Sequence, residues 1–289
     1  MESSSKTRLC GLIGDPVEHS VSPQMFNAAF QATRRDLVYV AMRVDKRELA
    51  SAIAGMRALK IHGMNVTIPH KINVLRYLDY VESNARAIGA VNTILNKKGK
   101  LRGFNTDGTG AARAIEESGT LLEGSNAVLV GSGGAARAIA FTLLDRVGKL
   151  TILNRHRDKA RRLAVELLRK KKVKVYSGGL HEESLKQTLA DSQIVINATS
   201  VGMSPNANDS ILNESLLKPD MVVLDIVYNP LETRLLRTAA KVGAKTVNGV
   251  GMLVRQGAEA FKIWTGEDAP VELMRKVVLE ELSRLSGRT

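Results

Sequence analysis

A strand-like stretch of the sequence ends in a residue that could take part in proton chemistry. In "NVTIPHK", Asn65 to Lys71, Val66 and Ile68 alternate with polar residues, which is the periodicity of a β-strand. Pro69 has no N–H to donate and therefore ends the strand. Lys71 places an ammonium group just past this break, in an otherwise apolar neighbourhood.

Other polar residues stand where loops are expected, and they would complete a polar pocket. They are Ser20 and Ser22 of "EHSVSP", Asn65, Thr67, Asn92 of "AVNT", Asn105 and Asp107 of "FNTDG", and Gln256. Each also has a structural explanation: Ser22 as a helix cap, Asn92 as a turn cap, "NTDG" as an Asx-turn, and Lys71 as a surface salt bridge. Together they supply hydroxyls, amides, one ammonium and one carboxylate, which suits a small polyhydroxylated acid beside a nicotinamide.

A glycine-rich turn marks a second candidate site. The stretch "AVLVGSGGAARAIA" places Gly131, Gly133 and Ala136 in G-x-G-x-x-A, after an apolar strand and at the start of a helix. Gly131 allows a tight turn, and Gly133 lets the backbone approach a pyrophosphate next to the free N–H groups of the helix. A plain strand–helix turn is the simpler interpretation, but the surrounding α/β pattern favours dinucleotide binding.

The residues after the next strand indicate which dinucleotide binds. A site for NAD usually carries Asp or Glu about 20 residues on, where it binds the ribose 2′-hydroxyl. In "ILNRHRDK" the corresponding positions are Asn154, Arg155, His156 and Arg157. A guanidinium binds the 2′-phosphate of NADP through two hydrogen bonds, whereas a carboxylate would repel it, so we expect NADP. Arg157 and Lys159 also have a simpler explanation as the start of a basic helix.

Two α/β units are expected to position these residues. The first part predicts strands over 8–14, 37–44 and 63–68, helices over 22–34 and 46–60, and a hairpin over 90–107. From Asn126 onward the pattern predicts six strands, over 127–131, 150–154, 173–177, 193–199, 221–227 and 245–249. Helices separate most of them, which is typical of a doubly wound parallel sheet.

The predicted fold class is therefore α/β, with two domains and a cleft between them. Residues 1–107, joined by C-terminal helices at about 256–289, are expected to form the substrate domain. Residues 108–255 are expected to form a six-stranded Rossmann-type NADP domain.

Composition limits the other classes of protein. With 289 residues, 44% hydrophobic and 25% charged, the chain is globular in character. No apolar run approaches the about 20 residues that span a bilayer, and the N-terminus lacks the charged start and apolar run of a signal peptide. The one cysteine, Cys10, excludes an intramolecular disulfide and is expected to be buried. These features predict a cytoplasmic protein without membrane contact.

The net charge of +13 raises the possibility of a nucleic-acid partner. The one dense basic stretch, residues 155–172, reads as an amphipathic helix with an exposed face. Aromatic residues make up only 4% of the chain, and neither zinc-finger spacing nor an RNA-binding motif accompanies the basic stretch. We therefore expect a general attraction for small anions, no nucleic-acid partner and no metal site.

The combined motifs resemble those of the shikimate dehydrogenase family. From about Gly11 to Gly266, in family order, they are "GDPVEHSVSPQMFNAAF", "NVTIPHK", "AVNT", "FNTDGTG", "GSGGAARA", "NRHRDKA", "NATSVGM", "DIVYNPLETRLL" and "NGVGMLVRQGAEAFKIWTG". The resemblance implies reversible NADP-dependent reduction of 3-dehydroshikimate to shikimate, in the chorismate route to aromatic amino acids. His156 departs from the pattern, since the family commonly has threonine there.

The same resemblance implies roles for individual residues. Lys71 and Asp107 would form the catalytic pair. The substrate would be bound by Ser20, Ser22, Asn65, Thr67, Asn92, Tyr228 and Gln256. The cofactor would be bound by Gly131, Ser132, Gly133, Gly134, Ala135, Asn154, Arg155, His156, Arg157, Lys159, Thr199, Ile226, Gly249 and Met252. A homodimer is compatible with this assignment.

Two alternatives stay open at this point. A quinate/shikimate dehydrogenase that uses NAD is disfavoured by the missing acidic residue, although a pocket cannot strongly reject an analogue that merely adds a hydroxyl. A non-catalytic module that binds NADP or shikimate for regulation is disfavoured because Lys71 and Asp107 are both present.

Overall fold

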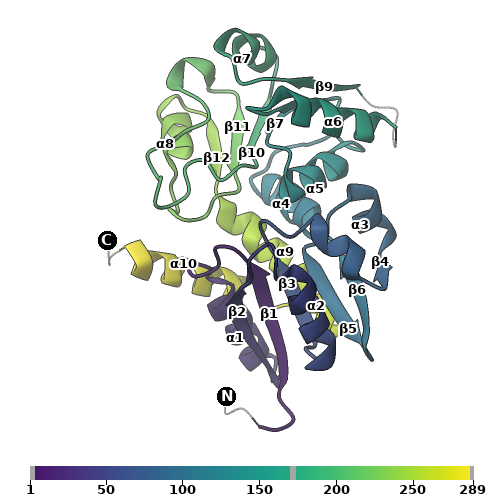
Figure 1. Cartoon of the computed structure of the whole chain (residues 1–289). Coiled ribbons are helices and arrows are strands. Elements are labelled where there is room, and N and C mark those ends of the chain that lie inside the picture. Colours follow the sequence, from purple (N-terminus) through teal and green to yellow (C-terminus); the bar gives the residue numbers. More distant parts are fainter. Residues whose placement is uncertain (1–3, 170–173, 287–289) are drawn as a thin grey trace. The chain divides into compact units, whose positions relative to one another are not determined.

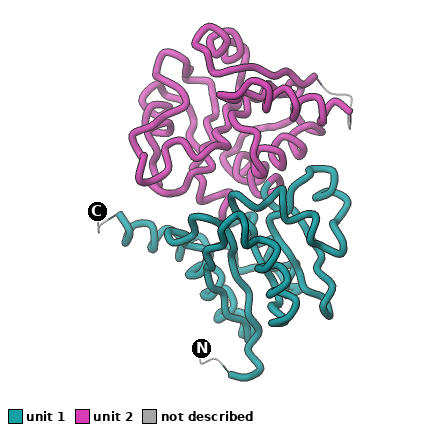
Figure 2. Tube along the Cα trace, in the orientation of Figure 1, with its two compact units in different colours: residues 1–107, 254–289 teal, residues 108–253 magenta. Residues whose placement is uncertain are grey.

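The computed structural model describes residues 4–169 and 174–286, which belong to two compact units. Unit 1 comprises residues 1–107 and 254–289, and unit 2 comprises residues 108–253 (Figure 2). Each unit contains one six-stranded sheet with helices beside it (Figure 1). The α/β prediction is confirmed. The predicted basic helix within residues 155–172 and the predicted strand over 173–177 both extend into residues 170–173, which lie outside the described residues.

Unit 1 is built on a mixed sheet with strand order β2-β1-β3-β5-β6-β4. Its strands are β1 (Arg8–Gly14), β2 (Leu37–Arg43), β3 (Gly63–Val66), β4 (Tyr80–Val81), β5 (Thr93–Lys97) and β6 (Lys100–Phe104). Its helical segments are α1 (Ser22–Ala32), α2 (Leu49–Ala58), η1 (Asn73–Tyr77), α3 (Ser83–Ile88), most of α9 (Gly249–Thr265) and α10 (Val271–Ser286). Strands β1, β2 and β3 are parallel, whereas β5 runs antiparallel to β3 and β6.

An aromatic cluster joins helices to the unit 1 sheet. Phe26 of α1 stacks on Tyr39 of β2 with ring centroids 4.6 Å apart, and Trp264 of α9 lies 5.2 Å from Phe26. The Trp264 indole N–H donates to the Ile94 carbonyl at 3.0 Å, so its polar atom is satisfied inside the core. Gly63 leaves room for this indole, because a Cβ there would stand 2.5 Å from Nε1.

Unit 2 is built on a fully parallel sheet with strand order β12-β11-β10-β7-β8-β9. Its strands are β7 (Asn126–Val130), β8 (Lys149–Leu153), β9 (Lys174–Gly178), β10 (Ile194–Asn197), β11 (Val222–Asp225) and β12 (Lys245–Val247). The helical segments are α4 (Asp107–Glu117), α5 (Gly134–Leu143), α6 (Arg157–Leu168), α7 (Glu182–Leu189), η2 (Glu214–Leu216) and α8 (Arg234–Lys241). This order is the doubly wound Rossmann arrangement, which reverses direction between β7 and β10.

Some local details differ from the predictions. Helix α1 begins at Ser22 with Val21 as its N-cap and without a side-chain cap, so the proposed capping role of Ser22 is wrong. Helix α2 begins at Leu49, three residues later than predicted. Strand β4 has two residues, too few to show any periodicity, and the sequence does not predict it.

The burial of the single cysteine agrees with the prediction from the sequence. Cys10 is fully buried in β1, and burial raises the pKa of its thiol to about 12. Because the thiolate is the reactive form, this residue is a small core side chain rather than a nucleophile. No described helix is long and apolar enough to cross a membrane.

The contact between Gly63 and Trp264 predicts an effect on stability. We expect Gly63→Ala to lower the free energy of unfolding by about 1–3 kcal/mol, because the added methyl must displace the indole. Gly55 in α2 is a matched control, since a Cβ there meets no atom within 4 Å and alanine favours a helix. Denaturant unfolding would test this, and equal stability of the two alanine variants would contradict it.

Candidate functional site

The unit 1 sheet brings the polar motifs to one edge. Strands β1 and β3 are parallel neighbours, so their carboxyl ends lie at the same edge of the sheet. The segments that follow these two strands carry Ser20 and Lys71 and therefore both begin at that edge. Strand β5 runs the opposite way, with Asn65 paired to Thr93, so its first residues lie at that edge too. Strand β6 ends there, because Thr93 is paired with Phe104. Four segments far apart in sequence therefore meet at one place.

Lys71 and Asp107 form a largely buried ion pair at this edge. Lys71 Nζ donates to Asp107 Oδ2 at 2.6 Å, and the side chains are 14% and 4% exposed. A surface salt bridge is therefore excluded. Asp107 begins α4, where the helix dipole favours a carboxylate, and its N–H donates to Asn105 Oδ1 at 3.0 Å. The Asx-turn and the ion pair thus coexist, each using a different part of Asp107.

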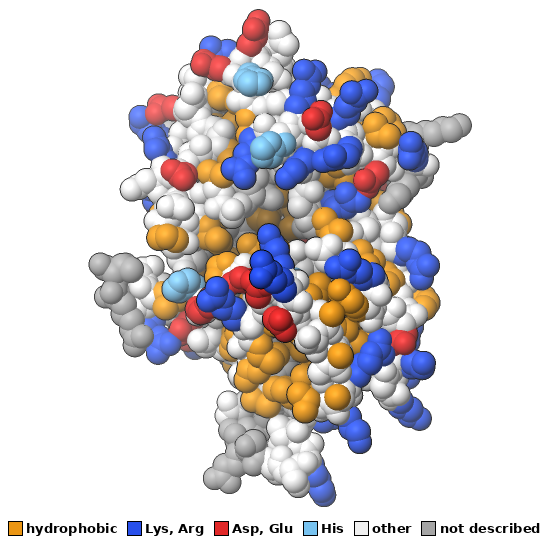
Figure 3. All heavy atoms as spheres, viewed as in Figure 1, with side chains coloured by type: hydrophobic (Ala, Val, Ile, Leu, Met, Phe, Trp, Pro, Cys, Tyr) orange, Lys and Arg blue, Asp and Glu red, His pale blue; other side chains and the backbone are white. Residues whose placement is uncertain are grey.

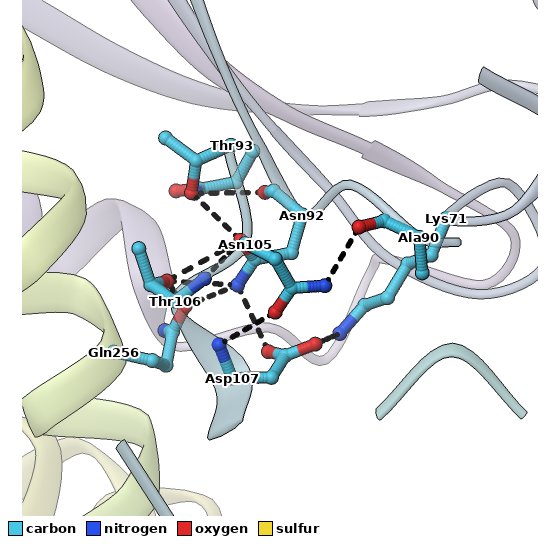
Figure 4. A network of polar contacts seen from close by, with 9 residues as sticks. Lys71, Ala90, Asn92, Thr93, Asn105, Thr106, Asp107 and Gln256 are labelled. Carbon is cyan, nitrogen blue, oxygen red and sulfur yellow. Dashed lines mark hydrogen bonds and ion pairs between the residues drawn. The ribbon is translucent and has the colours of Figure 1, made fainter. Parts of the chain in front are cut away.

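Asn92 is the centre of the polar contacts around this pair (Figure 4). Its buried amide nitrogen donates to Thr106 Oγ1 and Asp107 Oδ1 at 2.9 Å each, and lies 3.3 Å from Gln256 Oε1. Its Oδ1 accepts from the Thr106 N–H at 2.9 Å and from the Thr93 hydroxyl at 3.0 Å. Asn92 therefore fixes the oxygen of Asp107 that Lys71 does not contact.

Asn65 supports this arrangement from inside the protein. Its Oδ1 accepts from the Tyr39 hydroxyl at 2.8 Å. Its Nδ2 donates to the Asn92 carbonyl at 3.2 Å and to Thr93 Oγ1 at 3.1 Å. Because the side chain is buried and both ends are hydrogen-bonded, Asn65 connects the core to the strand that carries Asn92.

The predicted hydroxyl groups lie on the segments that follow β1 and β3. Ser20 is half-buried and Ser22 buried, and the Ser22 N–H approaches Ser20 Oγ at 3.3 Å. Thr67 is half-buried directly after β3, and its N–H donates to the Ile13 carbonyl at 2.9 Å. The backbone of Thr67 is thus tied to β1, while no hydrogen bond between described residues is assigned to its hydroxyl.

The glycine-rich turn of unit 2 fits an anionic group. Gly131 has φ +128°, and a Cβ there would stand 2.7 Å from the Ala198 carbonyl oxygen, so only glycine is accommodated. Gly133 precedes α5 as an N-cap without a side-chain hydrogen bond, and a Cβ there meets no atom within 4 Å. The backbone at Gly133 is therefore open to a ligand, next to the start of α5, where helix N–H groups favour a pyrophosphate.

A basic cavity lies beside the start of α6. It has a volume of about 450 Å³ and is lined by Arg157, Asp158, Arg161 and Ser177. The sequence prediction included Arg157 but missed Asp158, Arg161 and Ser177. Arg161 follows Arg157 by one helical turn, so helix periodicity could have indicated it. Ser177 belongs to the neighbouring strand β9, and no local pattern connects it to α6.

The residues just after β8 are arranged by a local turn. Asn154 donates to Ser132 Oγ at 2.9 Å and accepts from the His156 N–H at 2.8 Å, which joins this turn to the glycine-rich turn. Arg155, His156 and Lys159 are exposed. None of the ion pairs between described residues involves Arg155. In Figure 3, Lys and Arg side chains outnumber acidic ones on the visible face of unit 2.

The remaining predicted cofactor residues lie at or near the carboxyl ends of strands in unit 2. Thr199 follows β10 and Ile226 follows β11, as does Tyr228, which was predicted as a substrate residue. Gly249 begins α9, and a Cβ on it would stand 2.5 Å from the Ile226 carbonyl oxygen, so this glycine permits a close approach. Met252 is buried in the same helix. Within the described residues, no group of three His, Cys, Asp or Glu side chains could hold a metal ion.

The last residue of β11 is a buried carboxylate that the sequence interpretation overlooked. Asp225 is fully buried and accepts hydrogen bonds from Asn197, Val227 and Thr233. Burial raises the pKa of Asp225 to about 6, while these hydrogen bonds act in the opposite direction. Its position in "DIVYNP", at the end of an apolar strand, is the signal that could have identified it.

A Rossmann sheet with a glycine-rich turn, together with a lysine–aspartate pair, defines the class of nicotinamide-dependent dehydrogenases. Family models match three parts of the chain. The shikimate dehydrogenase substrate binding domain matches residues 12–94, shikimate/quinate 5-dehydrogenase matches 113–230, and the shikimate 5′-dehydrogenase C-terminal domain matches 249–279. Similarity to individual proteins extends over nearly the whole chain.

A shikimate dehydrogenase (NADP(+)) of Methanocaldococcus jannaschii is 47% identical over 97% of this chain and 99% of its own length. A crystal structure of a shikimate dehydrogenase in complex with NADP+ has a TM-score of 0.92 and 47% identity, covering 97% of this chain and 98% of its own. The shikimate 5-dehydrogenase of Listeria monocytogenes in complex with shikimate and NAD has a TM-score of 0.88 and 39% identity, with coverage of 96% and 98%. The chain belongs to the shikimate dehydrogenase family.

The contact between Asn92 and Asp107 predicts a pH-dependent loss of stability when a carboxylate replaces the neutral amide donor. Asn92→Asp would replace an N–H donor by an oxygen 2.9 Å from Asp107 Oδ1. Repulsion favours a proton on this pair in the folded state, so the folded state binds more protons than the unfolded state and stability falls as pH rises. Melting temperatures between pH 4.5 and 8 should show a widening deficit relative to the wild type.

Asn96→Asp is the matched control, because Asn96 is half-buried in the same hairpin and both of its side-chain partners are neutral backbone groups. Its Nδ2 donates to the Met56 carbonyl at 3.4 Å, and its Oδ1 accepts from the Gly99 N–H at 2.9 Å. Its melting temperature should follow the wild type across the pH range. A constant deficit for Asn92→Asp at every pH would show that the amide does not face a charged Asp107.

Proposed function

We propose that this chain catalyses the reversible NADP-dependent reduction of 3-dehydroshikimate to shikimate, a step in chorismate and aromatic amino acid biosynthesis. The observation that carries the proposal is the buried contact between Lys71 and Asp107, 2.6 Å long, at an edge lined with amides and hydroxyls. Family membership over nearly the full chain supports it. An assay of cofactor reduction with shikimate, comparing NADP and NAD, tests it directly.

The chemistry follows from the charges at this edge. When NADP is bound it accepts hydride from the carbinol carbon, and the hydroxyl proton must leave separately. Lys71 can exchange that proton and, in the reverse direction, stabilise the developing alkoxide. Asp107 orients the Lys71 ammonium through Oδ2, while Asn92 holds Oδ1, so the lysine is directed by a carboxylate that cannot rotate freely.

The substrate residues divide into direct contacts and support. We assign the carboxylate of shikimate to the hydroxyls of Ser20 and Ser22, and its ring hydroxyls to Thr67, Asn92 and Gln256. Because α1 is capped without the Ser22 side chain, that hydroxyl is not required by the helix. Asn65 acts through Asn92 in this assignment, since both ends of its side chain are hydrogen-bonded within the protein.

The cofactor assignment rests on the shape of the glycine-rich turn for the pyrophosphate and on the positive charge near α6 for the 2′-phosphate. The glycine-rich turn from Gly131 to Ala135 would hold the pyrophosphate at the start of α5. The basic cavity with Arg157 and Arg161 lies on the helix that follows the second strand of this sheet, close in sequence to Arg155. Guanidinium groups there favour the 2′-phosphate that distinguishes NADP from NAD.

A quinate/shikimate dehydrogenase that also uses NAD is the second candidate. One matching family model is that of shikimate/quinate 5-dehydrogenases, which names both substrates. The Listeria monocytogenes relative was crystallised with shikimate and NAD. Ratios of kcat/KM for the four combinations of substrate and cofactor distinguish the candidates. We also propose that the protein is cytoplasmic and forms a homodimer. The buried Cys10 thiol is consistent with a cytoplasmic location.

Replacing Lys71 tests the catalytic role. We expect Lys71→Ala to lower kcat by about 10²–10⁴, the usual contribution of a general acid–base group, and to change the affinity for shikimate much less. Lys100→Ala is a matched control, because Lys100 is an exposed lysine of the same unit. Steady-state kinetics measure kcat, and calorimetric titration with shikimate measures its affinity. A variant that retains more than about a tenth of the wild-type kcat would refute the role.

Replacing Arg155 tests cofactor selection. We expect Arg155→Ala to raise KM for NADP by roughly 10-fold and to leave NAD almost unaffected, because one charge-assisted contact contributes about 1.5–3 kcal/mol. Arg155→Asp should reduce the preference further, since a carboxylate repels the phosphate and accepts from a free 2′-hydroxyl. The measurement is kcat/KM for both cofactors in each variant.

Arg162→Ala serves as the control for a change in net charge, since Arg162 is exposed on α6 outside the basic cavity. If Arg155 variants keep the NADP/NAD ratio within about threefold of the wild type, selection belongs to Arg157 and Arg161 instead.

A further inference from the structure

The buried Asp225 lies at the junction of three strand ends in unit 2. It is the last residue of β11 and is paired in register with Asn197, the last residue of β10. Asn197 is in turn paired with Val130, the last residue of β7. The three strands therefore end at the same level, where a doubly wound sheet binds its ligand.

The carboxylate of Asp225 receives a hydrogen bond from each neighbouring segment. Asn197 Nδ2 donates to Oδ1 at 2.9 Å, and the Val227 N–H donates to the same oxygen at 3.1 Å. The Thr233 hydroxyl donates to Oδ2 at 2.7 Å while its oxygen caps α8. Asp225 thus connects the end of β10, the turn after β11 and the start of α8.

The contact with Asn197 extends the effect to the turn after β10. Asn197 Oδ1 accepts from both the N–H and the hydroxyl of Thr199, at 3.1 and 2.7 Å. Its Nδ2, the same group that reaches Asp225, also donates to the Val201 carbonyl at 3.2 Å. Orientation of the Asn197 amide therefore determines the path of the chain from 197 to 201.

The turn after β10 also abuts the glycine-rich turn. The Ala198 N–H donates to the Val130 carbonyl at 2.8 Å, and the Ala198 carbonyl oxygen occupies the space that a Cβ at Gly131 would need. A displacement of residues 197–201 would therefore disturb the backbone that faces the pyrophosphate. Asp225 is thus connected to the turn after β10 through Asn197, and through Ala198 to the glycine-rich turn.

We infer that Asp225 is a positioning residue for NADP: through Asn197 and Val227 it sets the turns after β10 and β11, the first of which abuts the glycine-rich loop. This inference rests on the proposed function, because it assumes that these turns bind NADP. It differs from a purely structural role in one respect: loss of the carboxylate should weaken binding of the cofactor more than binding of shikimate, which belongs to unit 1.

Calorimetric titration of the full-length protein with NADP, and separately with shikimate, tests the inference without requiring turnover. Asp225→Ala should raise Kd for NADP by about 10-fold or more, since misplacing binding groups by about 1 Å has effects of this size. Kd for shikimate should stay within about threefold. Asp225→Asn should recover most of the loss, because its Oδ1 can still accept from Asn197 and Val227.

Ser192→Ala is the matched control for a lost buried hydrogen bond. Ser192 is a buried residue just before the first residue of β10, at the opposite end of this strand from Asn197. Its hydroxyl donates to the Thr188 carbonyl at 2.6 Å. The control should lower the melting temperature and leave both Kd values unchanged. If Asp225→Ala does not fold, Asn197→Ala breaks the same connection from β10 and should give the same selective loss.

The outcomes are distinct. A wild-type protein that binds shikimate but not NADP would refute the proposed function. A wild type that binds NADP, with folded Asp225→Ala or Asn197→Ala variants whose Kd for NADP stays within about threefold, would overturn the positioning role. Equal weakening of NADP and shikimate, or an Asp225→Asn variant as weak as Asp225→Ala, would overturn it as well.

Discussion

Removal of the Lys71–Asp107 pair from water is the constraint on which the unit 1 site depends. Burying two charges carries a desolvation cost that their attraction offsets only with good geometry and further hydrogen bonds. The structure supplies these through Asn92, which donates to Asp107 Oδ1, and through the start of α4. Asn92 is itself held by Thr106 and by the strand pairing of β3 with β5, so the sheet as a whole fixes the direction of the lysine.

Unit 2 also buries an ionisable group at the ends of its strands, in this case a single carboxylate. Asp225 has no lysine or arginine among its hydrogen-bond donors in the described chain, and three neutral donors surround it instead. Neutral donors offset only part of the burial, which is why the pKa of Asp225 stays above its ordinary value. In both units a buried carboxylate accepts hydrogen bonds from segments that are far apart in the sequence.

Much of the fold could be predicted from the sequence because its signals are local. The apolar runs of β7, β8, β10 and β11, and the helices between them, appear as patterns within a few residues. The glycine spacing at 131–136 likewise reports a local backbone requirement, which the φ of Gly131 confirms. The capping of α1 was predicted wrongly, since Ser22 and Val21 are both compatible with a helix start and the choice depends on how the preceding loop enters the helix.

The sequence alone determined the α/β class, the glycine-rich turn, and which residue types are available for the chemistry. Only the tertiary structure decided which side chains pair. Asn92 meets Asp107 from 15 residues away and Gln256 from 164 residues away, distances over which no local pattern carries information. It also decided that Asn65 faces inward to Tyr39 and that Ser177 joins Arg157 at one cavity. The physical reason is that hydrogen-bond partners are set by strand register and order, which arise when distant segments pack together.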